Sequence, residues 1–169
     1  IAVFGFSGSG SAETAAKETA ARKIPLAGAV ISIDLGGGVT MEFVWVEAGE
    51  FNMGWNRDRT DVIWGADEMR YGVKISKGFW MGKYEVTQEQ WERVIGKNPS
   101  HFQEAGSNVP VDHVSWNDCQ EFLRKANEKC KEQLEGIDLR LPTEAEWEKA
   151  CRAASTGTYS CAEWELDEN

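Results

Sequence analysis

The feature that most constrains the fold is a helix-start signal that occurs three times in the second half of the chain. In each case a hydroxyl side chain precedes an amide or acid by three residues: Thr87 before Gln90, Ser115 before Asp118, and Thr143 before Glu146. The hydroxyl of an N-cap residue accepts a hydrogen bond from the backbone three positions on, and a Gln or Glu there returns the bond. The two threonine pairs are full capping boxes and the Ser–Asp pair is a weaker relative. We therefore expect three helices that begin at these residues.

The spacing of apolar residues predicts which face of each helix is buried. The second helix carries apolar residues at i, i+3, i+4, i+7 and i+11, namely Cys119, Phe122, Leu123, Ala126 and Cys130. The third repeats the pattern with Trp147, Ala150, Cys151 and Ala154. Such a stripe faces the core of an ordinary amphipathic helix. We therefore expect Cys119, Cys130, Cys151 and Trp147 to point inward.

The first half of the chain is typical of short strands. The runs AVISIDL and VTMEFVWV are β-branched and aromatic, and the glycines 36–38 between them predict a hairpin. EFNMG predicts a third strand, and VKISKGFWMGKYEV predicts further strand, with Gly78 and Gly82 as breaks or bulges. A long polar loop carrying Arg57, Asp58, Arg59, Asp61 and Asp67 lies between them. IDLGGGVT is also compatible with the phosphate turn of actin-like ATPases, but that fold needs a second phosphate loop, so a plain hairpin turn is favoured.

The composition of the sequence changes at Ile24, from helix formers with alternating charge before it to β-branched and aromatic runs after it. Residues 24–169 predict one domain, and residues 1–23 predict a leader or linker. Within that segment, IAVFGF followed by SGSGSA matches the end of a secretory signal peptide, and equally a strand end followed by a flexible linker. The first alternative favours an exported or periplasmic protein over a cytoplasmic one. No run approaches the eighteen or so apolar residues that a membrane span needs.

Charge and side-chain spacing exclude several functions. The net charge of −10 repels phosphate backbones, so nucleic acid is not an expected partner. Glu144, Glu146 and Glu148 cannot converge on one substrate, because helical residues two apart point in different directions. The four cysteines show no C-x-x-C pair, and Cys161 lies among acids that would raise its pKa. His101 and His113 are expected to be surface or structural histidines rather than metal ligands.

Four ordered blocks carry a resemblance to a known family. They are MEFVWVEAGEFNMG, KYEVTQEQWERVIGKNPSHF, VPVDHVSWNDCQEF and RLPTEAEWEKACRA. In order and spacing they resemble the formylglycine-generating enzyme family, also called the sulfatase-modifying factor domain, over about Gly36 to Cys161. TGTYS, which follows the last block, is similar to bacterial members. The matching family-signature positions, to which the resemblance gives a structural role, are Glu85, Thr87, Trp91, Ser115, Trp116, Arg140, Pro142, Thr143, Glu144, Glu146 and Trp147.

The resemblance implies an α+β fold related to the C-type lectin topology, with short strands, about three helices and much irregular structure. It implies a full-length protein that oxidises a cysteine of a sulfatase-type protein or peptide to formylglycine, or that carries out related oxygen-dependent sulfur chemistry. Copper held by two cysteines, and calcium, are the cofactors that the resemblance implies for that full-length protein. A non-catalytic peptide- or glycan-binding module on the same fold is the alternative. The family's catalytic cysteines, calcium ligands and closing blocks have no match here, so we expect a domain truncated at its C-terminus, inactive alone, with no catalytic, cofactor or metal residue. Cys151 matches a position that is cysteine in several members, whereas Leu123 replaces another such cysteine. Arg140 is expected to form a buried ion pair.

Overall fold

The computed structural model describes residues 5–6, 24–54 and 70–155. The chain divides into two compact units, each described here by itself. We call residues 1–47 and 79–142 the sheet unit, and residues 48–78 and 143–169 the ribbon unit. The polar loop expected between the third strand and the next, most of the leader or linker, and Cys161 lie outside the described residues. No described helix is both long enough and apolar enough to cross a lipid bilayer.

The sheet unit is built on an antiparallel sheet with the strand order β1-β6-β3-β2. The expected hairpin is confirmed, because β2 pairs with β3 from Val30 opposite Val44 to Asp34 opposite Thr40. The glycines of its turn, 36–38, all have φ between 69° and 87°, a region that L side chains rarely adopt. The strands of this sheet are β1 (Gly5–Phe6), β2 (Val30–Asp34), β3 (Thr40–Val46) and β6 (Phe79–Gly82).

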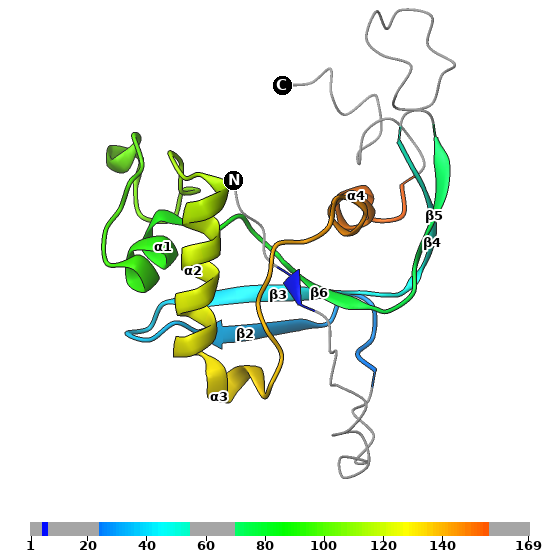
Figure 1. The fold of residues 1–169 in the computed structure, drawn as a ribbon, viewed down its shortest axis with the longest axis horizontal. Helices are drawn as coiled ribbons and strands as arrows, with labels where there is room; N and C mark the ends of the chain where they lie inside the picture. The colour runs from blue at the N-terminus through cyan, green and yellow to red at the C-terminus, as the bar shows by residue number, and fades with distance from the viewer. Residues whose placement is uncertain (1–4, 7–23, 55–69, 156–169) are drawn as a thin grey trace, which may run out of the picture. The chain divides into compact units, whose positions relative to one another are not determined.

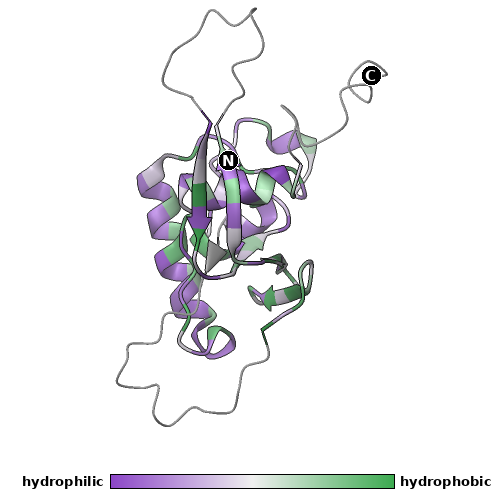
Figure 2. Cartoon of the chain, turned by 90° about the vertical axis from the view of Figure 1, so that its right-hand side faces the viewer, coloured by the Kyte–Doolittle hydropathy of each residue, from purple (hydrophilic) through white to green (hydrophobic). Residues whose placement is uncertain are grey.

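All three expected helices form, and each begins at the expected N-cap with a complete capping box. The Ser115–Asp118 box is complete too, since the Asp118 carboxylate accepts from the Ser115 backbone at 2.9 Å. The helices and the 3-10 turn of the sheet unit are α1 (Gln88–Ile95), η2 (Gln103–Ala105), α2 (Trp116–Lys129) and α3 (Lys131–Leu134). Figure 2 shows that the helices alternate hydrophilic and hydrophobic bands, as helices with one buried face do.

The core of the sheet unit lies between one face of the sheet and the helices α1 and α2, which cover that face (Figure 1). Ile33 and Phe43 project from the strands into it. Phe122 of α2 is fully buried and stacks on Trp91 of α1, with ring centroids 5.0 Å apart. The expected stripe of α2 is therefore confirmed, and its buried members are Cys119, Phe122, Leu123 and Ala126, followed by Cys130 at the C-cap.

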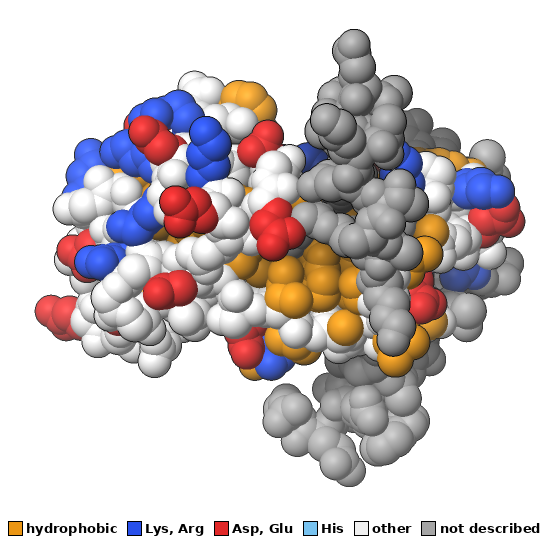
Figure 3. Space-filling model, turned by 90° about the horizontal axis from the view of Figure 1, so that it is seen from below, with side chains coloured by type: hydrophobic (Ala, Val, Ile, Leu, Met, Phe, Trp, Pro, Cys, Tyr) orange, Lys and Arg blue, Asp and Glu red, His pale blue; other side chains and the backbone are white. Residues whose placement is uncertain are grey.

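The other face of the sheet also carries apolar side chains. Strand alternation and the β3–β6 register place Val44, Val46, Phe79 and Met81 on that face. Phe79 and Met81 are buried, although neither belongs to the cluster beneath the helices. Figure 3, a view of the molecule from below, shows a group of hydrophobic side chains near the middle of the picture. This face is therefore apolar only where β3 pairs with β6, since Ser32 and Glu42, which pair across β2 and β3 on the same face, are polar.

The ribbon unit consists of a two-stranded antiparallel ribbon and one helix. Its elements are β4 (Gly49–Met53), β5 (Tyr71–Ile75) and α4 (Glu144–Arg152). The run VKISKGFWMGKYEV is thus two strands, β5 and β6, which belong to different sheets and are separated near Gly78. Helix α4 contacts β4 and β5 through polar side chains. Glu148 accepts a hydrogen bond from the backbone of Gly54 at 2.8 Å, and Arg152 donates to the Gly54 carbonyl at 2.8 Å.

The prediction that Trp147 and Cys151 point inward is wrong. Trp147 is 51% exposed and Cys151 is exposed. The reason is that α4 turns a different side, which carries Glu148 and Arg152, towards the ribbon, where the backbone groups of Gly54 need partners. An apolar stripe at helical spacing therefore shows that a helix has two unlike faces, but not which of them has a neighbour.

Candidate binding surface

A long loop between α1 and α2, residues 97–114, presents exposed aromatic side chains on a rigid base; we call it the 97–114 loop. Its base is Gln88 in the first turn of α1, which is only 2% exposed. The Gln88 amide donates to the carbonyl of Phe102 at 3.2 Å and accepts from Asn98 Nδ2 at 2.7 Å. Its backbone N–H donates to Val109 at 2.9 Å. One buried residue thus fixes both halves of the loop, the first through its side chain and the second through its backbone N–H.

The carboxylate of Asp112 is the second anchor of the 97–114 loop. It accepts from the backbone N–H of His101 at 2.9 Å and of Phe102 at 3.5 Å, and it contacts His113 Nδ1 at 2.6 Å. The bond from His101 and then the His113 ring lower the pKa of the Asp112 carboxyl. The backbone N–H of Asp112 donates to Ser100 Oγ at 3.2 Å, and Ser100 is itself buried. The loop is therefore preorganised by hydrogen bonds, together with Val111, whose side chain is buried in the core of the sheet unit.

Three rings stand next to one another on this base. The His101 ring meets the Phe102 ring edge-on at 4.9 Å, and it lies 5.7 Å from the His113 ring. Phe102 is 65% exposed, and His101 and His113 are exposed too. The expectation that both histidines lie at the surface is met, but they are not independent, because the loop brings them together. His113 has φ of 56°, which is uncommon for a residue with a side chain and occurs where surrounding contacts hold it.

The family-signature positions differ in burial, as Trp116 and Trp91 show. Trp116 opens α2 only three residues after His113 and is 66% exposed, whereas Trp91 is buried in the core. Glu146 is buried and accepts from the backbone of Thr143 at 2.8 Å, while Glu144 is exposed in the first turn of α4. Arg140 Nη1 donates to the Leu141 carbonyl at 3.1 Å, and its buried ion pair stays a prediction. Of the other signature positions, Thr87, Ser115 and Thr143 are N-caps, and Glu85 and Pro142 are half-buried.

Cys119 and Cys130 do not fit a copper site that needs both thiols. Cys119 and Cys130 are eleven residues apart along α2, which is about 16 Å of helix, whereas metal–sulfur bonds are about 2.3 Å long. Burial raises the pKa of both thiols, and the Cys130 thiol donates to the Asp34 carbonyl at 3.6 Å. Among the described residues no group of three or more His, Cys, Asp or Glu side chains could hold a metal ion.

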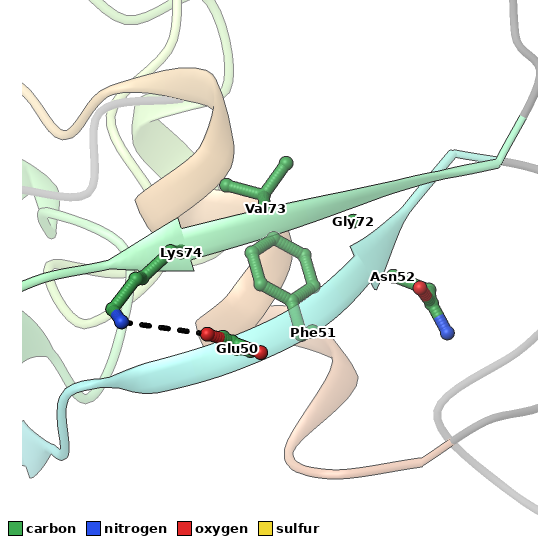
Figure 4. Close-up of a pocket in the computed structure, with 6 residues that line it drawn as sticks. All are labelled: Glu50, Phe51, Asn52, Gly72, Val73 and Lys74. Carbon is green, nitrogen blue, oxygen red and sulfur yellow. Dashed lines mark ion pairs between the residues drawn. The ribbon is translucent and has the colours of Figure 1, made fainter.

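A shallow hollow on the ribbon unit is the other surface feature of note. It is lined by Glu50, Phe51, Asn52, Gly72, Val73 and Lys74, and Figure 4 shows these side chains along β4 and β5. The hollow is open to solvent, and the Glu50–Lys74 ion pair at its edge is 3.5 Å long and well exposed. Exposed ion pairs contribute little free energy, and nothing here encloses a ligand. The 97–114 loop is the better candidate for binding.

Sequence reasoning missed the anchors of this surface. Gln88 and Asp112 were not predicted to anchor the loop, because they lie outside the capping and apolar patterns. A usable signal was present, since NPSHF and VDHVSW each place a histidine beside an apolar or acidic residue within one short connection between two helices. Polar residues so spaced satisfy a long loop's backbone groups.

The chain is similar to two curated proteins and two solved structures. It is 36% identical over 113 residues to Chaperone protein LppX of Paenibacillus barcinonensis, covering 48% of this chain and 40% of that protein. It is 46% identical over 50 residues to the Formylglycine-generating enzyme of Streptomyces coelicolor, covering 30% of this chain and 12% of that enzyme. The chain thus spans less than half the length of these relatives.

The solved structures support the expected fold. Treponema denticola variable protein 1 matches with a TM-score of 0.63 and 25% identity, over 81% of this chain and 62% of that one. PvdO from Pseudomonas aeruginosa also matches with a TM-score of 0.63, at 21% identity, over 82% of this chain and 56% of that one. The mixed α+β fold with short antiparallel strands is therefore confirmed. The profile of the Sulfatase-modifying factor enzyme 1-like domain matches residues 38–169, and the chain belongs to that family.

Proposed function

We propose that this chain supplies the polypeptide-binding scaffold of a formylglycine-generating-enzyme-type protein, and that the oxidation of a substrate cysteine needs residues beyond those described. The observation that carries the proposal is the exposed aromatic side chain of Phe102 on the hydrogen-bonded 97–114 loop. Exposed aromatic side chains on a rigid base are typical of binding hot spots, because little conformational entropy is lost on binding.

The state of the two buried thiols, Cys119 and Cys130, supports a binding role over a reactive one, whereas the third described thiol, Cys151, is exposed. The thiolate is the form of cysteine that attacks substrates and binds metals. Cys119 and Cys130 are buried with raised pKa values, so they remain thiols at neutral pH. Several expectations stay predictions from the sequence and the resemblance. They are the binding of copper and calcium by the full-length protein, a domain that starts at Ile24, truncation at the C-terminus, and export.

A polypeptide ligand is favoured over a glycan by the names of the relatives. One is called a chaperone protein and the other a formylglycine-generating enzyme. A chaperone binds polypeptides, and the enzyme family is expected from the resemblance to act on a cysteine of a protein. The alternative that this domain only binds, without any catalytic partner region, shares the same surface and rests on the first of these relatives.

The proposal is tested by fluorescence anisotropy with a labelled peptide that carries a sulfatase-type cysteine segment. We expect Phe102→Ala to weaken binding about tenfold or more, as loss of a hot-spot aromatic does. The variant keeps the loop intact, because Asp112 and Gln88 bind the Phe102 backbone and not its ring. Tyr71→Ala is the matched control, since Tyr71 is an exposed aromatic residue on β5.

Two outcomes would overturn the proposal. Equal affinity of the Phe102→Ala and unsubstituted chains would remove the 97–114 loop as the binding surface. The second concerns chemistry: the 169-residue chain is incubated with the same peptide, copper and oxygen, and aldehyde is measured by mass spectrometry. We expect no conversion, and measurable conversion would show that this chain is a complete catalyst.

A further inference from the structure

A second surface of the sheet unit lies at the β2–β3 turn, where two helices place cations against glycine backbone. Arg93 comes from the last turn of α1, and Lys129 ends α2. A Cβ atom added to Gly37 would sit 2.9 Å from Arg93 Nη2. A Cβ atom added to Gly36 would sit 3.0 Å from the same nitrogen and 3.5 Å from Lys129 Cε. Two positive side chains therefore converge on one glycine.

These cations lack carboxylate partners within the described parts of the chain. Neither side chain has an Asp or Glu oxygen within ion-pair distance there. Arg93 Nε donates to the Leu35 carbonyl at 3.4 Å, which leaves the outer nitrogens of the guanidinium available. The negative ends of two helices account for positive charge near each C-terminus, but not for the convergence of both cations on the turn.

The turn itself offers backbone donors beside the cations. The N–H of Leu35 donates to Val39 at 2.8 Å, and that of Gly36 donates to Asp34 Oδ1 at 2.6 Å. The N–H groups of Gly37 and Gly38 donate to no partner among the residues that the structure describes. Glycine at both positions lets a ligand approach the backbone closely. Successive backbone N–H groups beside an Arg fork are the donor set that binds oxyanions.

We propose that the β2–β3 turn binds a tetrahedral oxyanion, either inorganic phosphate or the phosphoryl group of a phosphate monoester. The Arg93 guanidinium and the Lys129 ammonium would face its oxygens, with Gly37 and Gly38 N–H groups completing the contact. The Asp34 carboxylate is already held by Gly36, and Gln133 fixes the Asp34 backbone through bonds of 2.9 and 2.8 Å. The site is therefore held in shape without a ligand. It is distinct from the 97–114 loop and does not depend on polypeptide binding.

The test is an NMR titration of the 169-residue chain with inorganic phosphate at constant ionic strength, following the amide signals of Gly37 and Gly38. We expect saturable shifts at these two amides, and a weaker response to acetate, which carries one charge. A second arm uses O-phosphoserine. Tighter binding of phosphoserine identifies a phosphoryl group on a larger molecule as the ligand, and tighter binding of phosphate identifies the free ion.

Matched variants separate a binding role from a structural one. Arg93→Gln should weaken phosphate binding about tenfold or more, because it removes a charge-assisted donor fork. Arg124→Gln is the control, since it makes the same charge change on α2, where Arg124 pairs with Glu121. Arg93→Lys keeps the charge and should restore part of the affinity. Shifts that stay linear with phosphate concentration, or equal affinities of the Arg93→Gln and Arg124→Gln chains, would overturn the proposal.

Discussion

Different interactions stabilise the interior of the sheet unit and the interior of the ribbon unit. In the sheet unit, Phe122 and Trp91 stack in a core of fully buried apolar side chains. In the ribbon unit, α4 reaches β4 and its end through the Glu148–Arg152 pair and through Lys149, which lies over the Phe51 ring at 5.6 Å. The first is stabilised by the removal of apolar surface from water, and the second by charge-assisted hydrogen bonds. Similar capping boxes thus begin helices that are stabilised in unlike ways.

The largest expected loss of stability comes from truncating a side chain in the apolar core of the sheet unit. Phe122→Ala should lower the free energy of unfolding by about 3–5 kcal/mol, because it removes a fully buried ring and leaves a cavity against Trp91. Urea unfolding monitored by tryptophan fluorescence measures the change. A loss below about 1 kcal/mol, the size typical of surface substitutions or less, would contradict a core centred on this stack.

Glu148→Ala tests the polar contacts that stabilise the ribbon unit. This change leaves Arg152 without its 2.6 Å partner and the Gly54 N–H without its acceptor, so we expect a cost of about 1–3 kcal/mol. Hydrogen exchange should quicken at residues 49–54 and stay unchanged in α2. Equal quickening in α2 would show that the two units are not stabilised separately.

The capping boxes allow a like-for-like comparison of the two units. Thr87→Ala and Thr143→Ala each remove one N-cap hydroxyl that accepts at 3.2 Å, from α1 and from α4. We expect each to cost about 1 kcal/mol, since a cap acts locally. Thermal unfolding of both variants measures this. A cost at Thr143 several times that at Thr87 would mean that the ribbon unit depends on its helix start far more than the sheet unit does.

The smallest effect is a pH dependence in the sheet unit. The folded-state pKa of Asp112 lies below its ordinary value of 3.8, chiefly because the His101 N–H donates to the carboxylate. Its contribution to stability is therefore present above pH 3.8 and is lost as the pH falls through the folded-state pKa. Asp112→Asn should flatten the acid limb of the stability curve. An unchanged acid limb would show that the anchor of the 97–114 loop is not this carboxylate.

The sequence predicts where helices, strands and turns form better than it predicts which residues pack against them. The glycine turn, the three N-caps and the buried stripe of α2 were all predictable, because backbone sterics and local hydrogen bonds act within a few residues. The orientation of α4 was not, because it depends on the backbone groups of Gly54, 94 residues from Glu148. The convergence of Arg93 and Lys129 on the glycine turn was hidden for the same reason. The meeting of His101 and His113 also needed the loop's fold, which Gln88 and Asp112 set.

Cysteine labelling tests the central claim most directly, since Cys119 and Cys130 lie in the buried core of the sheet unit, whereas Cys151 is exposed on the ribbon unit. The native chain is treated with iodoacetamide at neutral pH, and labelled positions are read by mass spectrometry with and without urea. We predict that Cys151 is modified in the native chain, while Cys119 and Cys130 react only after unfolding. Rapid native labelling of Cys119 or Cys130 would contradict both the buried core and the assignment of this chain to binding instead of thiol chemistry.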